Sequence, residues 1–239
     1  MKTLIALLAG LAALLLPAAS NAAPPHRAIH RAAAPVARDW SKVARRLPNG
    51  DFVEGNPDAK VKLVEFLSFT CPHCQHFEAE GIGPLTAKYI RTGLVSYEVR
   101  HALRDPFDLV ATLLSRCQGP QAFFAAAPLV FARQADWMEK AGQWAGAKPK
   151  LDGLKPAQQL QAAAEGSGLE ALFVAQGAPR AKLAACLADD AEAKRLADAA
   201  QAIWQPGFPG TPAFLINGIM ADNVIEWPAL DAKIAQALH

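Results

Sequence analysis

The stretch from Lys62 to Phe77, KLVEFLSFTCPHCQHF, carries the pattern from which the rest of the chain is interpreted. Residues 61–69 are almost continuously apolar, which predicts a strand that is covered on both faces. A turn with two cysteines at C-x-x-C spacing follows, Cys71 and Cys74. A helix is predicted to begin there, because Pro72 suits a first helical turn, in which its missing N–H has no partner to lose. The stretch therefore predicts a pair of thiols at the junction of a buried strand and a helix N-terminus.

A thiol at that junction is suited to redox chemistry. The free N–H groups of the first helical turn and the helix dipole favour negative charge, so a cysteine placed there ionises more readily than a free thiol. The thiolate is the form that attacks disulfides. We expect Cys71 to be this nucleophile, with His73 supplying a further donor or positive charge, and Cys74 to be the more shielded resolving thiol. A redox pair is favoured over half of a zinc site and over a purely structural disulfide, because the other two cysteines are single and far apart.

Glu65 interrupts the apolar strand six residues before Cys71. A carboxylate on such a strand is costly to bury unless it has partners or a chemical role. Two interpretations remain: Glu65 faces solvent at a pleat, or it lies beneath the dithiol as a proton acceptor with a raised pKa. The position relative to Cys71 favours the second.

The first 22 residues predict a secretory signal peptide. Lys2 is followed by an apolar run over 4–16, and Ser20 and Ala22 are small residues at the two positions that signal peptidase reads. The apolar run is short for a membrane span, and an uncleaved anchor is the alternative. Export places the mature chain in an oxidising compartment, where disulfides persist, and we expect a periplasmic protein.

After cleavage, about 217 residues remain, enough for one large domain or a domain with a sizeable insertion. Their net charge is near zero, which does not indicate nucleic acid as a partner. Residues 23–50 form a lead-in rich in Ala, Pro and Arg. Two interpretations remain for it: a mobile basic segment, or a segment with a short helix around 40–45 that docks or mediates oligomerisation.

A helix, a strand and a helical block are predicted after the cysteine turn. The helix that follows the turn is expected to kink near 81–84, where two glycines and a proline gather. Residues 94–100 alternate as a second strand. Over 105–204 alanine is abundant and apolar residues recur at helical spacing, which predicts five or six helices and no strands.

The C-terminal part predicts a hairpin and a closing helix. Residues 213–220 read as strand, Asn-Gly turn and strand. Pro212 lies at the edge of the first strand and is a candidate for a cis peptide bond. The amphipathic pattern of 227–238 predicts a last helix.

Two further cysteines, Cys117 and Cys186, lie on predicted helices. In an exported protein an even cysteine count suggests pairing, and four cysteines permit three connectivities. If Cys71 pairs with Cys74, then Cys117 with Cys186 is what remains. We interpret that pair as a structural disulfide, because nothing near either residue resembles an activated thiol site; two buried free thiols are the alternative.

These motifs in combination resemble the DsbA-like branch of the thioredoxin superfamily. The resemblance rests on SFTCPHC at 68–74 and GTPAFLING at 210–218, and it covers roughly 52–238. It implies an α/β thioredoxin-like fold with an inserted all-helical domain. Residues 51–104 and 205–239 would form the thioredoxin-like domain, and 105–204 the insertion.

The resemblance also implies roles for the residues that carry it. Cys71 forms mixed disulfides with substrates, Cys74 is its buried partner, and Pro72 and His73 are the dipeptide that tunes the reduction potential. The other implied site residues are Pro212, as a cis-proline facing the dithiol; Thr211, offering backbone groups to an extended substrate; Glu65, as the acid beneath the site; and Glu78, as a nearby acid. The implied partners are reduced, unfolded secreted proteins and a DsbB-like membrane quinone reductase, with no cofactor and a monomeric chain.

The direction of the reaction follows from the thiolate. Stabilising the thiolate stabilises the reduced form, which makes the disulfide form a stronger oxidant. His73 therefore favours a thiol:disulfide oxidase. Thr211 before Pro212 and the long lead-in keep a disulfide isomerase or reductase as a second hypothesis. A thioredoxin-like scaffold protein with an idle dithiol is the third.

Overall fold

The computed structural model describes residues 38–239, so the predicted signal peptide and most of the lead-in lie outside the described residues. The described chain forms one six-stranded sheet and a set of helices. The strands are β1 (Ala44–Arg46), β2 (Phe52–Gly55), β3 (Val61–Leu67), β4 (Val95–His101), β5 (Ala213–Ile216) and β6 (Ile219–Met220). The helices are η1 (Trp40–Lys42), α1 (Pro72–Leu85), η2 (Thr86–Ile90), α2 (Pro106–Arg116), α3 (Pro120–Ala132), α4 (Gln134–Gly146), α5 (Pro156–Gly166), α6 (Leu169–Ala175), α7 (Arg180–Leu187), α8 (Asp190–Ile203) and α9 (Trp227–Ala237).

Strand β3 lies inside the sheet, whose order is β1-β2-β4-β3-β5-β6. It runs parallel to β4 and antiparallel to β5, so its backbone is paired on both sides. The register places Phe66, near the end of β3, opposite Ala213, the first residue of β5. Because of this register, the cysteine turn after β3 and the Thr211-Pro212 segment before β5 lie next to each other at the same end of their strands.

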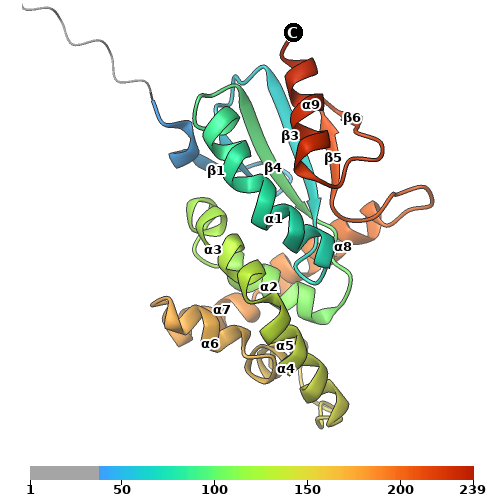
Figure 1. Cartoon of the computed structure of the whole chain (residues 1–239). Coiled ribbons are helices and arrows are strands. Elements are labelled where there is room, and N and C mark those ends of the chain that lie inside the picture. Colours follow the sequence, from blue (N-terminus) through green and yellow to red (C-terminus); the bar gives the residue numbers. More distant parts are fainter. Residues whose placement is uncertain (1–37) are drawn as a thin grey trace, which may run out of the picture. The chain divides into compact units, whose positions relative to one another are not determined.

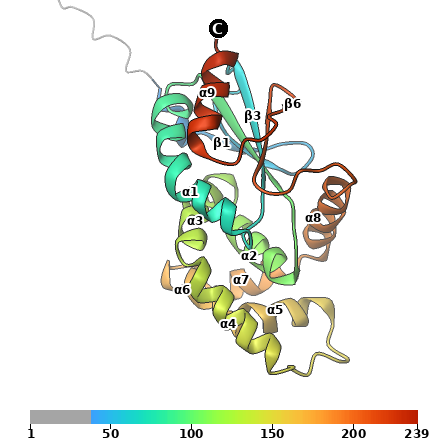
Figure 2. The same cartoon turned by 45° about the vertical axis from the view of Figure 1, so that its right-hand side comes forward.

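Helices cover both faces of the sheet, as an almost continuously apolar β3 requires. Figures 1 and 2 show α1 and α9 on one face and α8 on the opposite side. On the first face Phe77 of α1 packs against Phe214 of β5, with 4.8 Å between the ring centroids. On the second face Phe66 packs against Phe208, with 5.3 Å between the centroids.

The α/β thioredoxin-like fold with a helical insertion is confirmed. The insertion runs from α2 to α8 between β4 and β5, and Figure 1 shows most of its helices gathered beyond the end of the sheet to which β3 points. It contains seven helices in place of the predicted five or six. The prediction missed helix boundaries such as the one at Arg133, which ends α3 and begins α4, because no glycine or proline marks it. Within residues 38–239 no helix combines the length and apolarity needed to cross a membrane.

One helix and the lead-in bear on local expectations. Helix α1 is unbroken through 81–84, with Pro84 inside it, and its geometry changes to the π-helix η2 after Leu85. The lead-in also contributes to the sheet, because Ala44 pairs with Glu54 and Arg46 with Phe52. The sheet therefore begins before residue 51, the predicted domain boundary. Strand β1 has the sequence Ala-Arg-Arg, which lacks the apolar alternation that identifies a strand.

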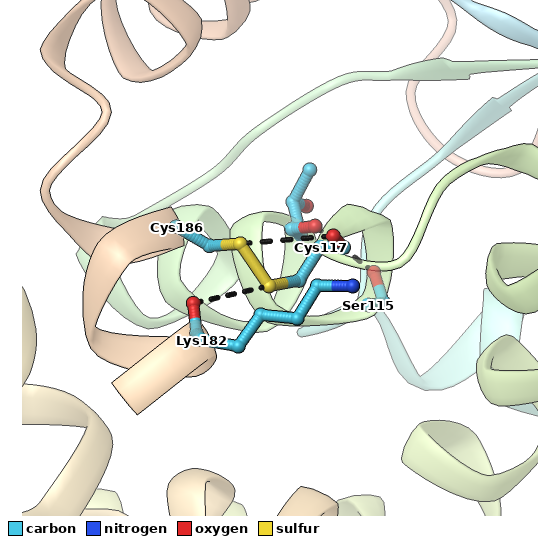
Figure 3. The surroundings of a disulfide bond; sticks show 5 residues. Ser115, Cys117, Lys182 and Cys186 are labelled. Carbon is cyan, nitrogen blue, oxygen red and sulfur yellow. Dashed lines mark hydrogen bonds between the residues drawn. A yellow bond between two sulfur atoms is a disulfide. The ribbon is translucent and has the colours of Figure 1, made fainter. Parts of the chain in front are cut away.

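A disulfide joins Cys117 and Cys186 (Figure 3). Cys117 ends α2 and Cys186 lies in α7, so the bond ties the first helix of the insertion to a late one across a sequence separation of 69 residues. The structure thus contains the pair that the sequence analysis favoured, and not two free thiols.

Replacing this disulfide is expected to destabilise the protein. Closing a loop of this length in the unfolded chain corresponds to about 4 kcal/mol in the chain-entropy model. We expect the Cys117→Ala/Cys186→Ala variant to lose about that much free energy of unfolding in urea, with an equal or higher m-value, because the chain without the crosslink unfolds to a less compact state. A loss below about 1 kcal/mol would show that the bond does not constrain the unfolded chain as this model assumes.

Candidate active site

The cysteine turn connects β3 to α1. Residues 68–71 form a tight turn in which the Cys71 N–H donates to the Ser68 carbonyl at 3.2 Å. Cys71 is the N-cap of α1 and has an extended backbone, and Pro72 is the first helical residue. The thiols of Cys71 and Cys74 are free and only 3% and 1% exposed, whereas Pro72 and His73 are exposed. The predicted strand, turn and helix are all present, and the dithiol is sheltered beneath its own dipeptide.

Hydrogen bonds stabilise Cys71 as an anion. The side chain of Cys74 contributes most, and the Thr211 side chain and the backbone N–H groups of Cys74 and His73 add to it. Together they lower the pKa of Cys71 to about 5, against burial, which acts in the opposite direction. His73 thus acts on the sulfur through its backbone, while its side chain faces solvent.

Cys74 has the opposite electrostatics. Burial raises the pKa of Cys74 far above that of a free thiol, and the hydrogen bond to Cys71 and the nearby charge of Glu65 raise it further. At neutral pH one sulfur is therefore an anion and its neighbour a protonated thiol. This asymmetry distinguishes the attacking cysteine from the resolving one.

The Thr211-Pro212 segment lies against Cys71. The peptide bond between Thr211 and Pro212 is cis, which confirms the prediction for Pro212. The Sγ of Cys71 is 3.1 Å from the carbonyl oxygen of Thr211, to which the neutral thiol donates. The structure therefore brings Cys71 and Thr211 together across 140 residues of sequence.

Glu65 is 1% exposed, which rules out the solvent-facing interpretation. The hydroxyl of Tyr97, on the neighbouring strand β4, donates to the carboxyl group of Glu65. Burial raises the pKa of Glu65 to about 7, with a smaller contribution from the charge of Cys71. Glu65 thus titrates near neutral pH and is electrostatically coupled to both cysteines.

Two more acids titrate in the same range. Burial raises the pKa of Glu78, on α1, to about 8, with a contribution from the charge of Glu65. Burial likewise raises the pKa of Glu54, on β2, to about 7. Glu54 is the cross-strand partner of Tyr97. Sequence analysis singled out neither Glu54 nor Tyr97, although an acid inside the short apolar strand FVEG is a signal of the kind that drew attention to Glu65.

The turn also receives contacts from the helical insertion that sequence analysis did not find. Asp108 of α2 and Gln134 of α4 are both buried and hydrogen-bond to the turn. No local pattern identifies them, because each lies more than 35 residues from the turn in sequence. Among residues 38–239 no three His, Cys, Asp or Glu side chains gather as metal ligands do. The Nε2 atom of His76 lies 3.3 Å from a carboxylate oxygen of Glu80, one turn further along α1.

Fold and site define a class of protein. The sheet, the flanking helices and the cis-proline opposite a C-x-x-C turn are those of a thioredoxin-like protein, and the ionised Cys71 beside a protonated Cys74 can carry out thiol–disulfide exchange. The chain belongs to the thioredoxin family, whose model matches residues 48–236.

Relatives of known class and solved structures agree with this assignment. A protein-disulfide oxidoreductase of Rickettsia bellii is 29% identical over 183 residues, which are 76% of this chain and 62% of the relative. The one from Rickettsia prowazekii is 29% identical over 77% of this chain and 60% of its own length. The chain thus spans about 60% of the length of the curated relatives it matches.

Solved structures match over more of their length. A protein-disulfide isomerase from Novosphingobium aromaticivorans is 32% identical and aligns with a TM-score of 0.70 over 83% of this chain and 99% of its own. The alpha-DsbA1 protein of Wolbachia pipientis is 25% identical, with a TM-score of 0.59 over 81% of this chain and 93% of that one. The protein is therefore structurally close to DsbA proteins, as the sequence resemblance implied.

The lowered pKa of Cys71 predicts reactivity in acid. Alkylation by iodoacetamide should follow the thiolate, so its rate is expected to fall to half only near pH 5, where a free thiol is almost entirely protonated. The rate is measured by mass spectrometry from pH 4 to 9. The Cys71→Ser variant serves as the control and should not react. A midpoint near pH 8 would contradict the stabilised anion.

The same shift links pH to stability. The folded pKa of Cys71 lies below its unfolded value, so its contribution to stability is present above the unfolded pKa and is lost as pH falls through the folded pKa. The free energy of unfolding of the reduced form, relative to the oxidised form, should therefore decrease from about pH 9 to about pH 5, by at most about 1.4 kcal/mol per pH unit. Urea unfolding of both redox forms at each pH tests this, and a pH-independent difference would refute it.

Proposed function

We propose that the protein is an exported thiol:disulfide oxidoreductase that introduces disulfides into secreted proteins through the Cys71–Cys74 couple. The observation that supports this most directly is the pKa of Cys71, lowered to about 5 beside a partner whose pKa is raised. A stabilised thiolate stabilises the reduced enzyme, and the free energy so gained makes the disulfide form oxidising.

The reaction consists of two exchanges. A substrate thiolate attacks Sγ of Cys71, the Cys71–Cys74 bond breaks, and Cys74 leaves and takes up a proton. A second substrate thiolate then attacks the substrate sulfur of the mixed disulfide and expels Cys71 as a thiolate. Two electrons pass from two substrate thiols to the enzyme. Of the two protons that the substrate thiols release, one ends on Cys74 and one in solvent.

Glu65 is the proposed proton carrier for Cys74. Its pKa of about 7 lets it hold or release a proton near neutral pH, and its charge already acts on Cys74. Its protonated form would supply the proton when Cys74 leaves, and its ionised form would accept that proton when the disulfide forms again. The Tyr97 hydroxyl orients the carboxyl group.

Substrates, partners and location are part of the same proposal. A reduced, unfolded client would lie as an extended segment along Thr211 and Pro212, within reach of Cys71. The reduced enzyme needs an electron acceptor, for which a DsbB-like membrane quinone reductase is the candidate implied by the resemblance. We propose a monomer in the periplasm, exported by the signal peptide of residues 1–22.

A disulfide isomerase or reductase is the second candidate. The similar protein from Novosphingobium aromaticivorans is described as a protein-disulfide isomerase. An isomerase must attack substrate disulfides from its reduced form, so a separate reductant has to keep it reduced. A scaffold protein with an idle dithiol is the third candidate, and it predicts no exchange at all.

The reduction potential of the Cys71–Cys74 couple distinguishes an oxidase from a reductase, and an inert couple supports the scaffold protein. After equilibration with glutathione, a value above about −180 mV supports the oxidase, and a value near −270 mV supports a reductase. Cys71→Ser should abolish oxidation of a reduced model protein. Cys74→Ser should accumulate a mixed disulfide through Cys71 when given a disulfide-bonded peptide. Undiminished oxidation by Cys71→Ser would refute all dithiol-based proposals.

A further inference from the structure

The turn that presents Cys71 is held from outside the thioredoxin-like sheet. Residues 68–71 join two regular elements, so most of their backbone groups lack partners within a strand or a helix; the Cys71 carbonyl, at the N-cap of α1, is the exception. Side chains that follow β4 in sequence supply several of these partners. The contacts of Asp108 and Gln134 are direct and buried, and that of Arg104 is partly buried.

Asp108 of α2 holds the first half of the turn. Its carboxyl group is fully buried and accepts hydrogen bonds from the Phe69 N–H at 2.9 Å and the Ser68 hydroxyl at 2.6 Å. It also accepts from the Arg104 N–H at 3.0 Å. The Arg104 guanidinium reaches the Thr70 carbonyl at 3.3 Å.

Gln134, the first residue of α4, holds the second half. Its side-chain nitrogen donates to the carbonyl of Phe69 at 2.8 Å and to that of Cys71 at 3.0 Å, and the residue is 6% exposed. The Cys71 carbonyl also accepts from the Gln75 N–H of α1 at 3.1 Å. Among residues 38–239 the Phe69 carbonyl accepts a hydrogen bond from Gln134 alone. One amide group therefore directs two carbonyls of the turn toward α4.

The orientation of these two carbonyls affects how the N–H groups of α1 reach the Cys71 sulfur. The Cys71 thiolate accepts from the N–H groups of His73 and Cys74, and this requires those groups to point at Sγ while the Cys71 carbonyl points elsewhere. Gln134 and Gln75 together occupy the Cys71 carbonyl. The oxidised form has no thiolate to stabilise, so this arrangement favours the reduced form.

We propose that Gln134 is a positioning residue for the redox couple: by holding the Phe69 and Cys71 carbonyls, it keeps the start of α1 aimed at the Cys71 thiolate and makes the couple more oxidising. This inference rests on the proposed function, because it needs a redox-active Cys71. It gives the helical insertion a chemical role in addition to its structural one.

The test compares two glutamines of one helix. Gln134→Met keeps the length of the side chain and removes both N–H donors. Gln143→Met makes the same change at an exposed position of α4, where the amide bonds only to Glu139. For the parent and both variants, the Cys71 pKa is measured by alkylation, and the equilibrium constant with glutathione by thiol quantification. Urea unfolding is measured in both redox forms.

We expect Gln134→Met to raise the Cys71 pKa by about one unit and to shift the equilibrium with glutathione about tenfold away from the reduced enzyme. For a two-electron couple that shift is about 30 mV toward a less oxidising potential. The unfolding equilibrium constant of the reduced form should rise about tenfold more than that of the oxidised form. Gln143→Met should leave all three quantities unchanged.

Equal destabilisation of both redox forms with an unchanged potential would overturn the proposal, because a purely structural hydrogen bond acts on both forms alike. If Gln134→Met does not unfold cooperatively, Gln134→Glu decides, since an ionised carboxylate opposite the two carbonyls should move the Cys71 pKa in the same direction. Failure of the proposed function is a separate outcome: the parent itself would then show an ordinary Cys71 pKa or an inert couple.

Discussion

The chemistry of this protein depends on the first free N–H groups of α1 being directed at one sulfur atom. Burial alone would raise the pKa of Cys71, as it raises those of Cys74 and Glu65 a short distance away. Of these three groups, only Cys71 accepts hydrogen bonds strong enough to lower its pKa against the effect of burial. Side-chain cations are absent from the main causes of this shift, so the reactivity of the thiol comes from backbone and hydroxyl or thiol donors whose positions the fold determines.

Three parts of the fold set those positions. The end of β3 places the turn at the edge of the sheet, and the β3–β5 pairing brings Thr211 to the same edge. The insertion then supplies Asp108 and Gln134 to the backbone of the turn. The groups that bond to the thiolate itself are the side chain and N–H of Cys74, the N–H of His73 and, from a distant segment, the Thr211 side chain.

Sequence alone predicts the parts of this arrangement that have a local signal. The apolar run of β3, the proline after Cys71, the Asn-Gly hairpin and the cis bond at Pro212 are each visible within a few residues, and each is present in the structure. Gln134 and Tyr97 act across separations of 65 and 32 residues, and nothing in their own neighbourhoods distinguishes them. Tertiary contacts of this kind follow only from knowing which face of which helix or strand meets the turn.

The buried acids show why the dithiol and its surroundings have to be considered together. Glu65, Glu78 and Glu54 have pKa values raised to about 7, 8 and 7, so each is stabilised in its protonated form and loses that stabilisation as pH rises through these values. Cys71 has the opposite pH dependence, because its anion is the favoured form. Between about pH 5 and pH 7 the site therefore carries negative charge on the Cys71 sulfur while Glu65 still holds a proton that Cys74 can take up. The neutral carboxyl group of Glu65 also spares the thiolate the repulsion that the ionised group would exert, so the burial that disfavours this carboxylate indirectly supports the anion on Cys71.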